Sequence, residues 1–207
     1  MGVYFFYSEV RPSFTAGPVG GKGIMIANKK HFSAIETLFE EDGFTDYKWI
    51  DPKEIVVAQW VRVRCQFGCP NYGRKAACPP NTPSVSECER FFKEYTHAVL
   101  FHIQIQFDIP ENRFAWYKKM TLKLSKLEQK VFLSGFEKAF FLLFGGCPLC
   151  KECKIDRALC NQPERARPAP EAFAVDVYTT VKKFGYPIAV RTEPTQSMDR
   201  YVLLMVK

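Results

Sequence analysis

The chain has 207 residues, of which 47% are hydrophobic and 25% are charged, and its formal net charge is +7. This composition is typical of a globular protein with one sizeable core, and it excludes a disordered chain. The basic charge is compatible with an acidic partner, whether protein, nucleotide or nucleic acid, and by itself favours none of them.

Residues 1–14 contain no basic start and no long apolar run, so we do not expect a signal peptide. The longest strongly apolar run, residues 139–144, is far shorter than the about 20 residues that span a bilayer. We therefore expect a cytoplasmic protein without membrane contact. The eight cysteines of such a chain stay reduced, which favours metal binding or redox chemistry over a disulfide framework.

The N-terminal part of the chain predicts one helix and one strand. Residues 17–23 are rich in glycine but do not meet the pattern of a phosphate-binding loop, so a turn is the better interpretation. Apolar side chains recur at helical spacing over residues 31–42, and Gly43 stands where a helix would end. A short strand is predicted over residues 44–50.

The next segments predict two helices and the clearest strand of the chain. Asp51 offers an N-cap, and the proline after it suits the first position of a helix that leads towards Cys65. Residues 83–95 predict an amphipathic helix with Cys88 on its apolar stripe. Residues 98–107 alternate between apolar and polar side chains, as in a half-buried strand.

The rest of the chain predicts further helices and strands around the cysteine-rich loop. Residues 112–144 have helical periodicity, with a kink or break expected at Gly135. Another helix is predicted over residues 170–184. Two strands, over residues 187–191 and 201–206, are predicted to close the chain.

Because helices lead into strands several times, we predict an α+β fold, with a mixed β-sheet covered by helices and a cysteine-rich metal-cluster loop region. The length favours a single domain, residues 1–207. Within it, residues 1–50 form an N-terminal segment and residues 55–207 the cysteine-rich metal-binding region.

The strongest motif is a group of four cysteines, three of them spaced Cys-x2-Cys-x2-Cys and the fourth after six intervening residues: Cys147, Cys150, Cys153 and Cys160. Three thiolates so close together on a short loop suit a [4Fe–4S] cluster, in which each binds a different iron. The gap before Cys160 departs from the bacterial ferredoxin pattern. Zinc is the alternative metal, although zinc sites more often use two separated Cys-x2-Cys pairs.

A second group of three cysteines is also predicted to bind metal: Cys65, Cys69 and Cys78. A cluster held by three cysteines keeps one iron open to substrate, water or a remote residue. The candidates for a fourth ligand are Cys160 by crossover, Cys88, and either His97 or His102. The apolar stripe makes Cys88 better explained as a buried core residue. We favour a four-plus-three arrangement.

Both cysteine groups, Tyr72-Gly73 and the stretch 167–177 resemble the domain-of-unknown-function 2284 family of predicted metal-binding proteins. The resemblance covers about Ile55 to the C-terminus. Ala169 and Ala174 depart from the pattern, in which serine and glycine are expected. The resemblance implies metal binding and no particular reaction.

The motifs together predict an iron–sulfur redox protein that transfers electrons through one, or two, [4Fe–4S] clusters. Basic residues near the four cysteines favour an acidic redox partner protein over nucleic acid: Lys151, Lys154, Arg157, Arg165 and Arg167. One alternative is an enzyme that uses an open iron, with Tyr72, Arg74 and Lys75 as nearby acid or anion-binding groups. The other alternative is a zinc-binding structural or nucleic-acid-binding protein.

Overall fold

The structure is a computed structural model, and it describes four ranges of the chain: residues 32–105, 112–190, 192–193 and 196–207. Residues 17–23, for which we predicted a turn, lie outside these ranges. The fold described below is that of the compact unit Ala34–Lys207. Within the described residues, no helix is both long enough and apolar enough to cross a membrane.

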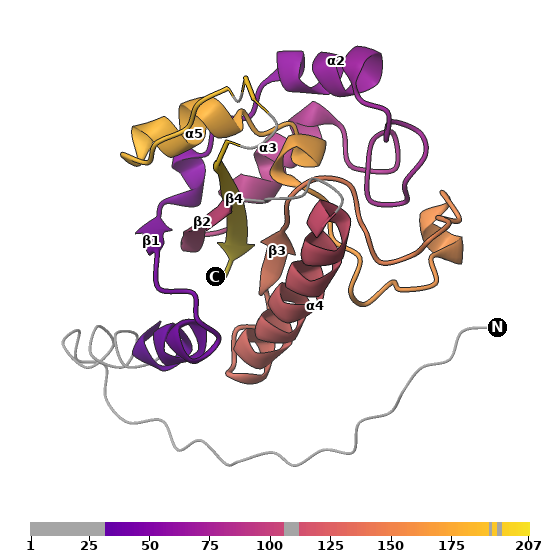
Figure 1. Ribbon diagram of the computed structural model, residues 1–207. Helices are drawn as coiled ribbons and strands as arrows, with labels where there is room; N and C mark the ends of the chain where they lie inside the picture. The colour runs from indigo at the N-terminus through magenta and orange to yellow at the C-terminus, as the bar shows by residue number, and fades with distance from the viewer. Residues whose placement is uncertain (1–31, 106–111, 191, 194–195) are drawn as a thin grey trace. The chain divides into compact units, whose positions relative to one another are not determined.

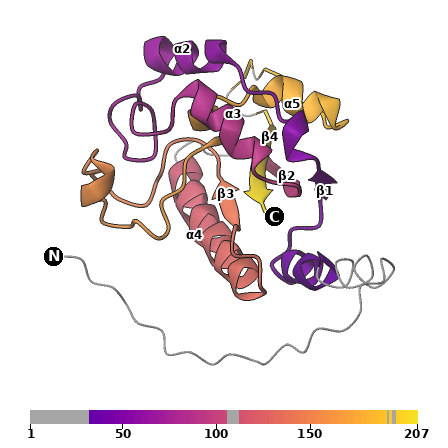
Figure 2. The same ribbon diagram turned by 180° about the vertical axis from the view of Figure 1, so that it is seen from behind.

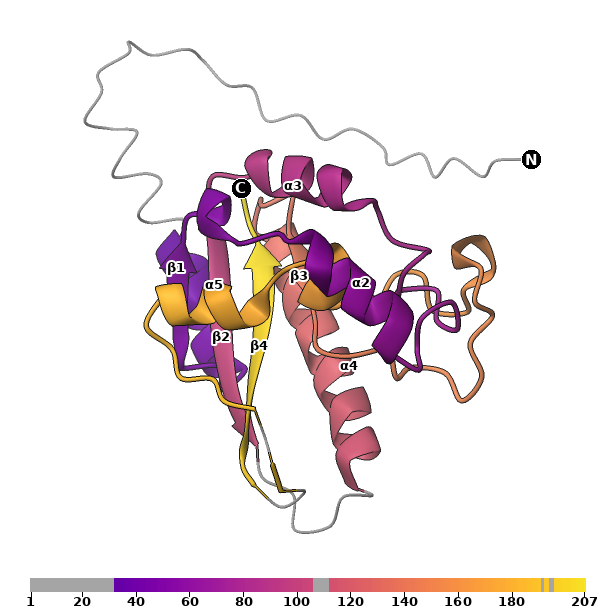
Figure 3. The same cartoon turned by 90° about the horizontal axis from the view of Figure 1, so that it is seen from above.

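The centre of this unit is a four-stranded sheet formed by β1 (Tyr47–Ile50), β2 (Ala98–Ile105), β3 (Phe140–Leu142) and β4 (Met198–Met205). The strands follow one another in the order β1-β2-β4-β3, as Figure 3 shows. The presence of both helices and a β-sheet confirms the predicted α+β class. The prediction of a mixed sheet is wrong, because every described strand pair is antiparallel.

Helices cover both faces of the sheet (Figures 1 and 2). On one face, α3 (Val85–Lys93), the 3-10 helix η3 (Pro170–Phe173) and α5 (Val177–Lys183) share an apolar cluster with the strands. The other face carries α4 (Asn112–Leu133) and the helical residues 34–41. The two layers leave little of the sheet open to water.

This double cover changes the character of β2. We predicted a half-buried strand, yet Val99 and Leu100, which point to opposite faces, are 0% and 1% exposed. Only the second half of the strand, from His102 to Gln104, is partly open to water. Phe101 packs its ring edge-on against Phe39, with the ring centroids 4.9 Å apart.

Several predicted helix ends are confirmed. The helical residues 32–41 stop before Gly43, which has a φ of +72°, a conformation that favours glycine. Asp51 does act as an N-cap, but of the single 3-10 turn η1 (Pro52–Glu54), and α2 (Gln59–Gly68) starts separately after it. The break at Gly135 is confirmed, because α4 ends at Leu133.

Three predicted elements are corrected. The apolar run at residues 139–144 contains strand β3 instead of continuing the helix, because it pairs with the buried strand β4. The helix predicted over residues 170–184 is divided at Ala174, whose φ of +57° ends η3. This conformation favours glycine, the residue expected here from the family resemblance. Residues 187–190 form no strand.

Candidate metal centre

The first cysteine group lies at the end of α2 and in the loop after it. Cys65 is in the last turn of the helix, and Cys69 caps it, its backbone N–H donating to the Cys65 carbonyl at 3.2 Å. The loop then folds back, and the Gly73 N–H donates to the Pro79 carbonyl at 2.8 Å. These turns bring Cys78 back to the cavity that Cys65 and Cys69 line.

This three-cysteine cavity has a volume of about 420 Å³. Its wall includes side chains that can ionise or hydrogen-bond: Arg64, Asn71, Tyr72, Glu171, Asp176 and Tyr178. The Cys65 Sγ lies 3.9 Å from the backbone oxygen of Glu171, so η3 closes one side of the cavity. The space exceeds what three thiols and one metal need, and it can admit a further ligand.

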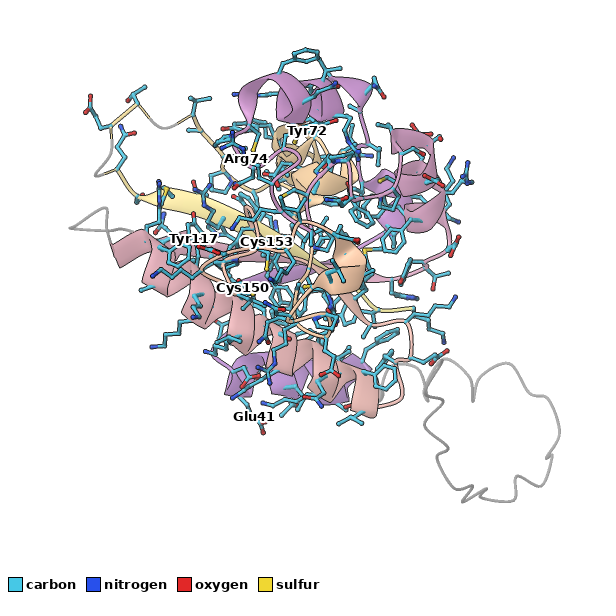
Figure 4. The ribbon with its side chains drawn as sticks, turned by 90° about the vertical axis from the view of Figure 1, so that its right-hand side faces the viewer. Glu41, Tyr72, Arg74, Tyr117, Cys150 and Cys153 are labelled. Atoms are coloured by element: carbon cyan, nitrogen blue, oxygen red, sulfur yellow. The ribbon has the colours of Figure 1, made fainter. Side chains whose placement is uncertain are left out.

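The second cysteine group surrounds a smaller cavity. Its wall consists of eight residues: Ala76, Ala77, Cys147, Cys150, Cys153, Cys160, Gln162 and Ala166. The structure thus brings together all four cysteines of the predicted set, including Cys160, and Figure 4 shows two of them, Cys150 and Cys153. The donor set is four sulfurs enclosed by small side chains, which fits an iron–sulfur cluster by its chemistry.

Short local contacts give the four-cysteine loop its shape. Asp156 accepts a hydrogen bond from the Ala158 N–H at 2.8 Å and caps the 3-10 turn η2 (Arg157–Leu159). Ile155 has a φ of +66°, which a β-branched residue rarely adopts. The side-chain amide of Asn81 donates to the Ile155 carbonyl at 3.1 Å and holds this strained turn.

Backbone N–H groups point at two of the sulfurs. The Ala76 N–H lies 3.3 Å from the Sγ of Cys153. A hydrogen bond from the Leu149 backbone acts to lower the pKa of Cys147, against the larger effect of burial, which raises it. Such bonds stabilise negative charge on a sulfur, as a bound metal requires of its thiolates.

The two cysteine groups lie next to each other. Asn71, in the first loop, is so close to Gly146 that a Cβ there would stand 2.8 Å from the Asn71 Nδ2. Cys78 lines the first cavity, while Ala76 and Ala77, just before it, line the second. The Cys147 thiolate also contributes to raising the pKa of Cys78. One loop therefore forms a wall of both sites.

Two thiols of the first group, Cys65 and Cys78, have a raised pKa and hold their protons strongly without a metal. Burial raises the pKa of Cys78 to about 12, and the neighbouring Cys69 and Cys65 add to the effect. Burial also raises the pKa of Cys65, followed by repulsion from Cys69. Several sulfurs in a poorly hydrated site cannot all be charged unless a cation compensates them, and a bound metal supplies that charge.

A buried ion pair fastens the chain where it leaves the four-cysteine loop. Arg167 Nε lies 3.0 Å from both carboxylate oxygens of Glu128, in α4, and the two side chains are only 15% and 8% exposed. Glu128 also accepts the Phe141 N–H at 2.6 Å, so it links the loop, the helix and strand β3. The Leu143 N–H donates to the Pro168 carbonyl at 2.8 Å beside it.

The other fourth-ligand candidates lie elsewhere. Cys88 is 0% exposed in the apolar cluster under α3, and its thiol lies 3.6 Å from the Pro83 carbonyl oxygen. His102 is bonded through both ring nitrogens, to Asp46 at 2.7 Å and to Asp199 at 2.8 Å. Neither Cys88 nor His102 lines a cysteine cavity, and the same holds for His97.

The sequence also named side chains beside the first group. Tyr72 lines the three-cysteine cavity, whereas Lys75 lines a different one and Arg74 lines neither cysteine cavity. Sequence reasoning missed Glu171 and Tyr178, because they follow the second cysteine group. The resemblance over residues 167–177 was the only signal for Glu171.

In the described part of the chain, no group of three or more His, Cys, Asp and Glu side chains is arranged to hold a single metal ion. No curated protein and no solved structure is significantly similar to the chain. A family model with the description "Predicted metal-binding protein (DUF2284)" matches residues 48–206, which include all eight cysteines. The chain therefore belongs to this family of predicted metal-binding proteins.

Proposed function

We propose that the protein is an iron–sulfur redox protein that binds a [4Fe–4S] cluster through Cys147, Cys150, Cys153 and Cys160. The observation that carries the proposal is that these four cysteines, and no other ionisable side chain, line one small cavity. A bound cluster supplies single-electron transfer at this position. The N–H groups of Ala76 and Leu149 stabilise the negative charge on the sulfurs.

The second centre is proposed at Cys65, Cys69 and Cys78. The presence of Cys160 in the other cavity supports a four-plus-three arrangement over a crossover. With three cysteines this centre has an open position that faces the larger cavity. Because Cys78 lines one cavity while Ala76 and Ala77 line the other, the two proposed centres would lie side by side, as electron transfer between them requires.

Electron transfer also needs a partner that supplies or removes electrons. Exposed basic side chains flank the four cysteines: Lys151, Lys154, Arg157 and Arg165. Such a surface attracts an acidic redox protein through transient, salt-sensitive contacts. We place the protein in the cytoplasm, where thiols remain reduced.

A second function is an enzyme in which the three-cysteine centre acts on a substrate. The observation that favours it is the cavity of about 420 Å³ beside Cys65, Cys69 and Cys78, with Tyr72, Tyr178 and Glu171 in its wall. These side chains can bind and orient a substrate, and the phenols can donate a hydrogen bond to it. A zinc-binding structural protein remains the third alternative.

Anaerobic purification followed by iron, sulfide and zinc analysis tests the proposal. We expect at least four irons and four sulfides per chain and a visible absorbance that dithionite bleaches. Zinc without sulfide would overturn the iron–sulfur proposal. Turnover of a substrate would favour the enzyme, whereas rapid reoxidation by an acidic electron carrier without turnover would favour electron transfer.

A further inference from the structure

A third cavity, larger than the other two, adjoins both cysteine groups. Its volume is about 960 Å³, and its wall comes from α4, β4, the start of α5 and the loops around Gly145 and Gly146. It shares six lining residues with the three-cysteine cavity: Asn71, Gly145, Gly146, Glu171, Val177 and Tyr178. Cys147 also lines it, so a molecule in this cavity lies beside both proposed metal centres.

The charges of this cavity favour an anion. Lys75, Arg113 and Arg200 line it, and none of the three forms an ion pair with any carboxylate in the described residues. Two acidic side chains also line it. One of them, Asp199, is held by the His102 ring at 2.8 Å, which leaves Glu171 as the remaining acid.

The guanidinium of Arg200 is held in position. Its Nε donates to the Tyr117 hydroxyl at 2.8 Å, and the group lies 5.9 Å from the centre of that ring. The hydroxyl of a phenol is neutral, and although the guanidinium also attracts the nearby Glu171 carboxyl, it forms no ion pair with it and can still bind a carboxylate or phosphate through its other N–H groups. Figure 4 shows Tyr117 on α4.

Aromatic side chains form the other part of the wall. The rings of Tyr117 and Phe144 have their centroids 5.2 Å apart, and Phe114, Tyr178 and Tyr201 also line the cavity. An inorganic anion would leave these surfaces unused, whereas a planar organic body can pack against them. The volume is at the upper end of the about 300–1,000 Å³ that small-molecule sites have.

We propose that this cavity binds a small organic anion, with a planar body against Tyr117 and Phe144 and a carboxylate or phosphate at Arg113 and Arg200. The other end of the molecule points to the wall that is shared with the three-cysteine cavity. Binding itself is independent of the metal centres. The consequence that the bound anion is the redox substrate rests on the proposed function.

The test measures binding of three probes to the anaerobically purified full chain by calorimetry at low salt: inorganic phosphate, benzoate and AMP. We expect AMP or benzoate to bind with one site per chain and more tightly than phosphate. The double variant Arg113→Gln/Arg200→Gln should weaken that binding at least about tenfold, the loss of about 1.4 kcal/mol. Its iron content and circular dichroism should not change.

The matched control is Lys119→Gln/Lys126→Gln, which removes the same charge from exposed positions of α4 outside the cavity. It should change binding less than twofold. If both double variants weakened probe binding equally, the probe would be attracted only by the net charge of the protein, and the proposed site would be overturned. The proposal of an organic anion would be overturned if no probe bound saturably at millimolar concentration. It would also be overturned if phosphate bound as tightly as AMP and benzoate.

The redox role has its own readout, which separates the two proposals. We expect the bound probe to change the electron paramagnetic resonance spectrum of the reduced protein, and the change to disappear in Cys69→Ala. Binding without any spectral change would overturn the substrate role and leave the binding site standing. If the anaerobically purified chain binds the probe but contains no iron, the proposed function is overturned and the binding site stands.

Discussion

The two cysteine groups have different surroundings, although they share a wall. The four-cysteine cavity is small and lined otherwise by alanines and one glutamine, so only sulfur can take part in chemistry there. The three-cysteine cavity is lined by phenols, carboxyl groups and an arginine, and it adjoins the larger cavity. Under the proposed function, the first site has room for a cofactor alone, whereas the second has room for a cofactor and a further molecule.

The largest effect is expected from Cys150→Ala in the four-cysteine group. Because a metal bound only by the folded state adds its binding free energy to folding, the variant should lose about 5 kcal/mol or more of the free energy of unfolding. Iron analysis and thermal unfolding check this. Leu159→Ala, at an exposed position of the same loop, is the control and should retain all iron. If Cys150→Ala retained all iron and sulfide, the cysteines of this group would not be the metal ligands.

The next largest loss of stability is expected when the ion pair between Glu128 and Arg167, at the end of the four-cysteine loop, is removed. Glu128→Ala leaves the Arg167 charge and the Phe141 N–H without their partner, so we expect a loss of about 3–5 kcal/mol in denaturant unfolding. Lys130 lies on the same helix as Glu128 and forms an ion pair with Asp42, which Lys130→Ala removes. Since that lysine is 43% exposed, its loss should cost less than about 1 kcal/mol. If both variants lost the same free energy of unfolding, burial would not make the first ion pair more stabilising than the second.

Cys69→Ala tests whether the two groups are separate. After anaerobic reconstitution with iron and sulfide, it should lose the iron of the three-cysteine centre and keep that of the four-cysteine centre. We expect a stability loss of about 1–3 kcal/mol, smaller than for Cys150→Ala, because Cys69 is exposed at the end of α2. Cys153→Ala is the reciprocal variant. Complete loss of iron in either one would mean a shared site.

The smallest effect is expected from Cys88→Ala. This thiol is packed in the core and lines neither cysteine cavity, so the iron and sulfide content should stay the same. Its replacement removes one buried sulfur and should cost about 1–2 kcal/mol in the free energy of unfolding. Loss of a whole cluster would identify Cys88 as a ligand after all, and would turn the four-plus-three arrangement into two four-cysteine sites.

The local parts of the site could be predicted from the sequence, because a few intervening residues force Cys147, Cys150 and Cys153 to stay close. The capping signals at Gly43 and Asp51 were reliable for the same reason. The contact between the two cysteine groups could not be predicted. It depends on the place of β3 at the edge of the sheet, which delivers the second loop beside the first.

The predictions that failed concern features that are decided by burial in the tertiary structure. An apolar run such as residues 139–144 can be a helix or a strand, and pairing with β4 made it a strand. The alternation in β2 suggested one wet face, but helices on both sides of the sheet buried Val99 and Leu100 alike. Glu171 lies in η3, which ends at Ala174, whereas we predicted one continuous helix over residues 170–184.

The position of β4 in the sheet has a consequence for synthesis. This strand pairs with both β2 and β3, yet it follows every cysteine in the chain. A ribosome therefore releases both cysteine groups before the middle of the sheet can form, and their thiols stay accessible during that interval. Under the proposed function, this is the stage at which the cysteines of the nascent chain are open to cluster insertion, and oxidants reach them at the same stage. Once β4 is inserted, the sheet that supports both loops is complete.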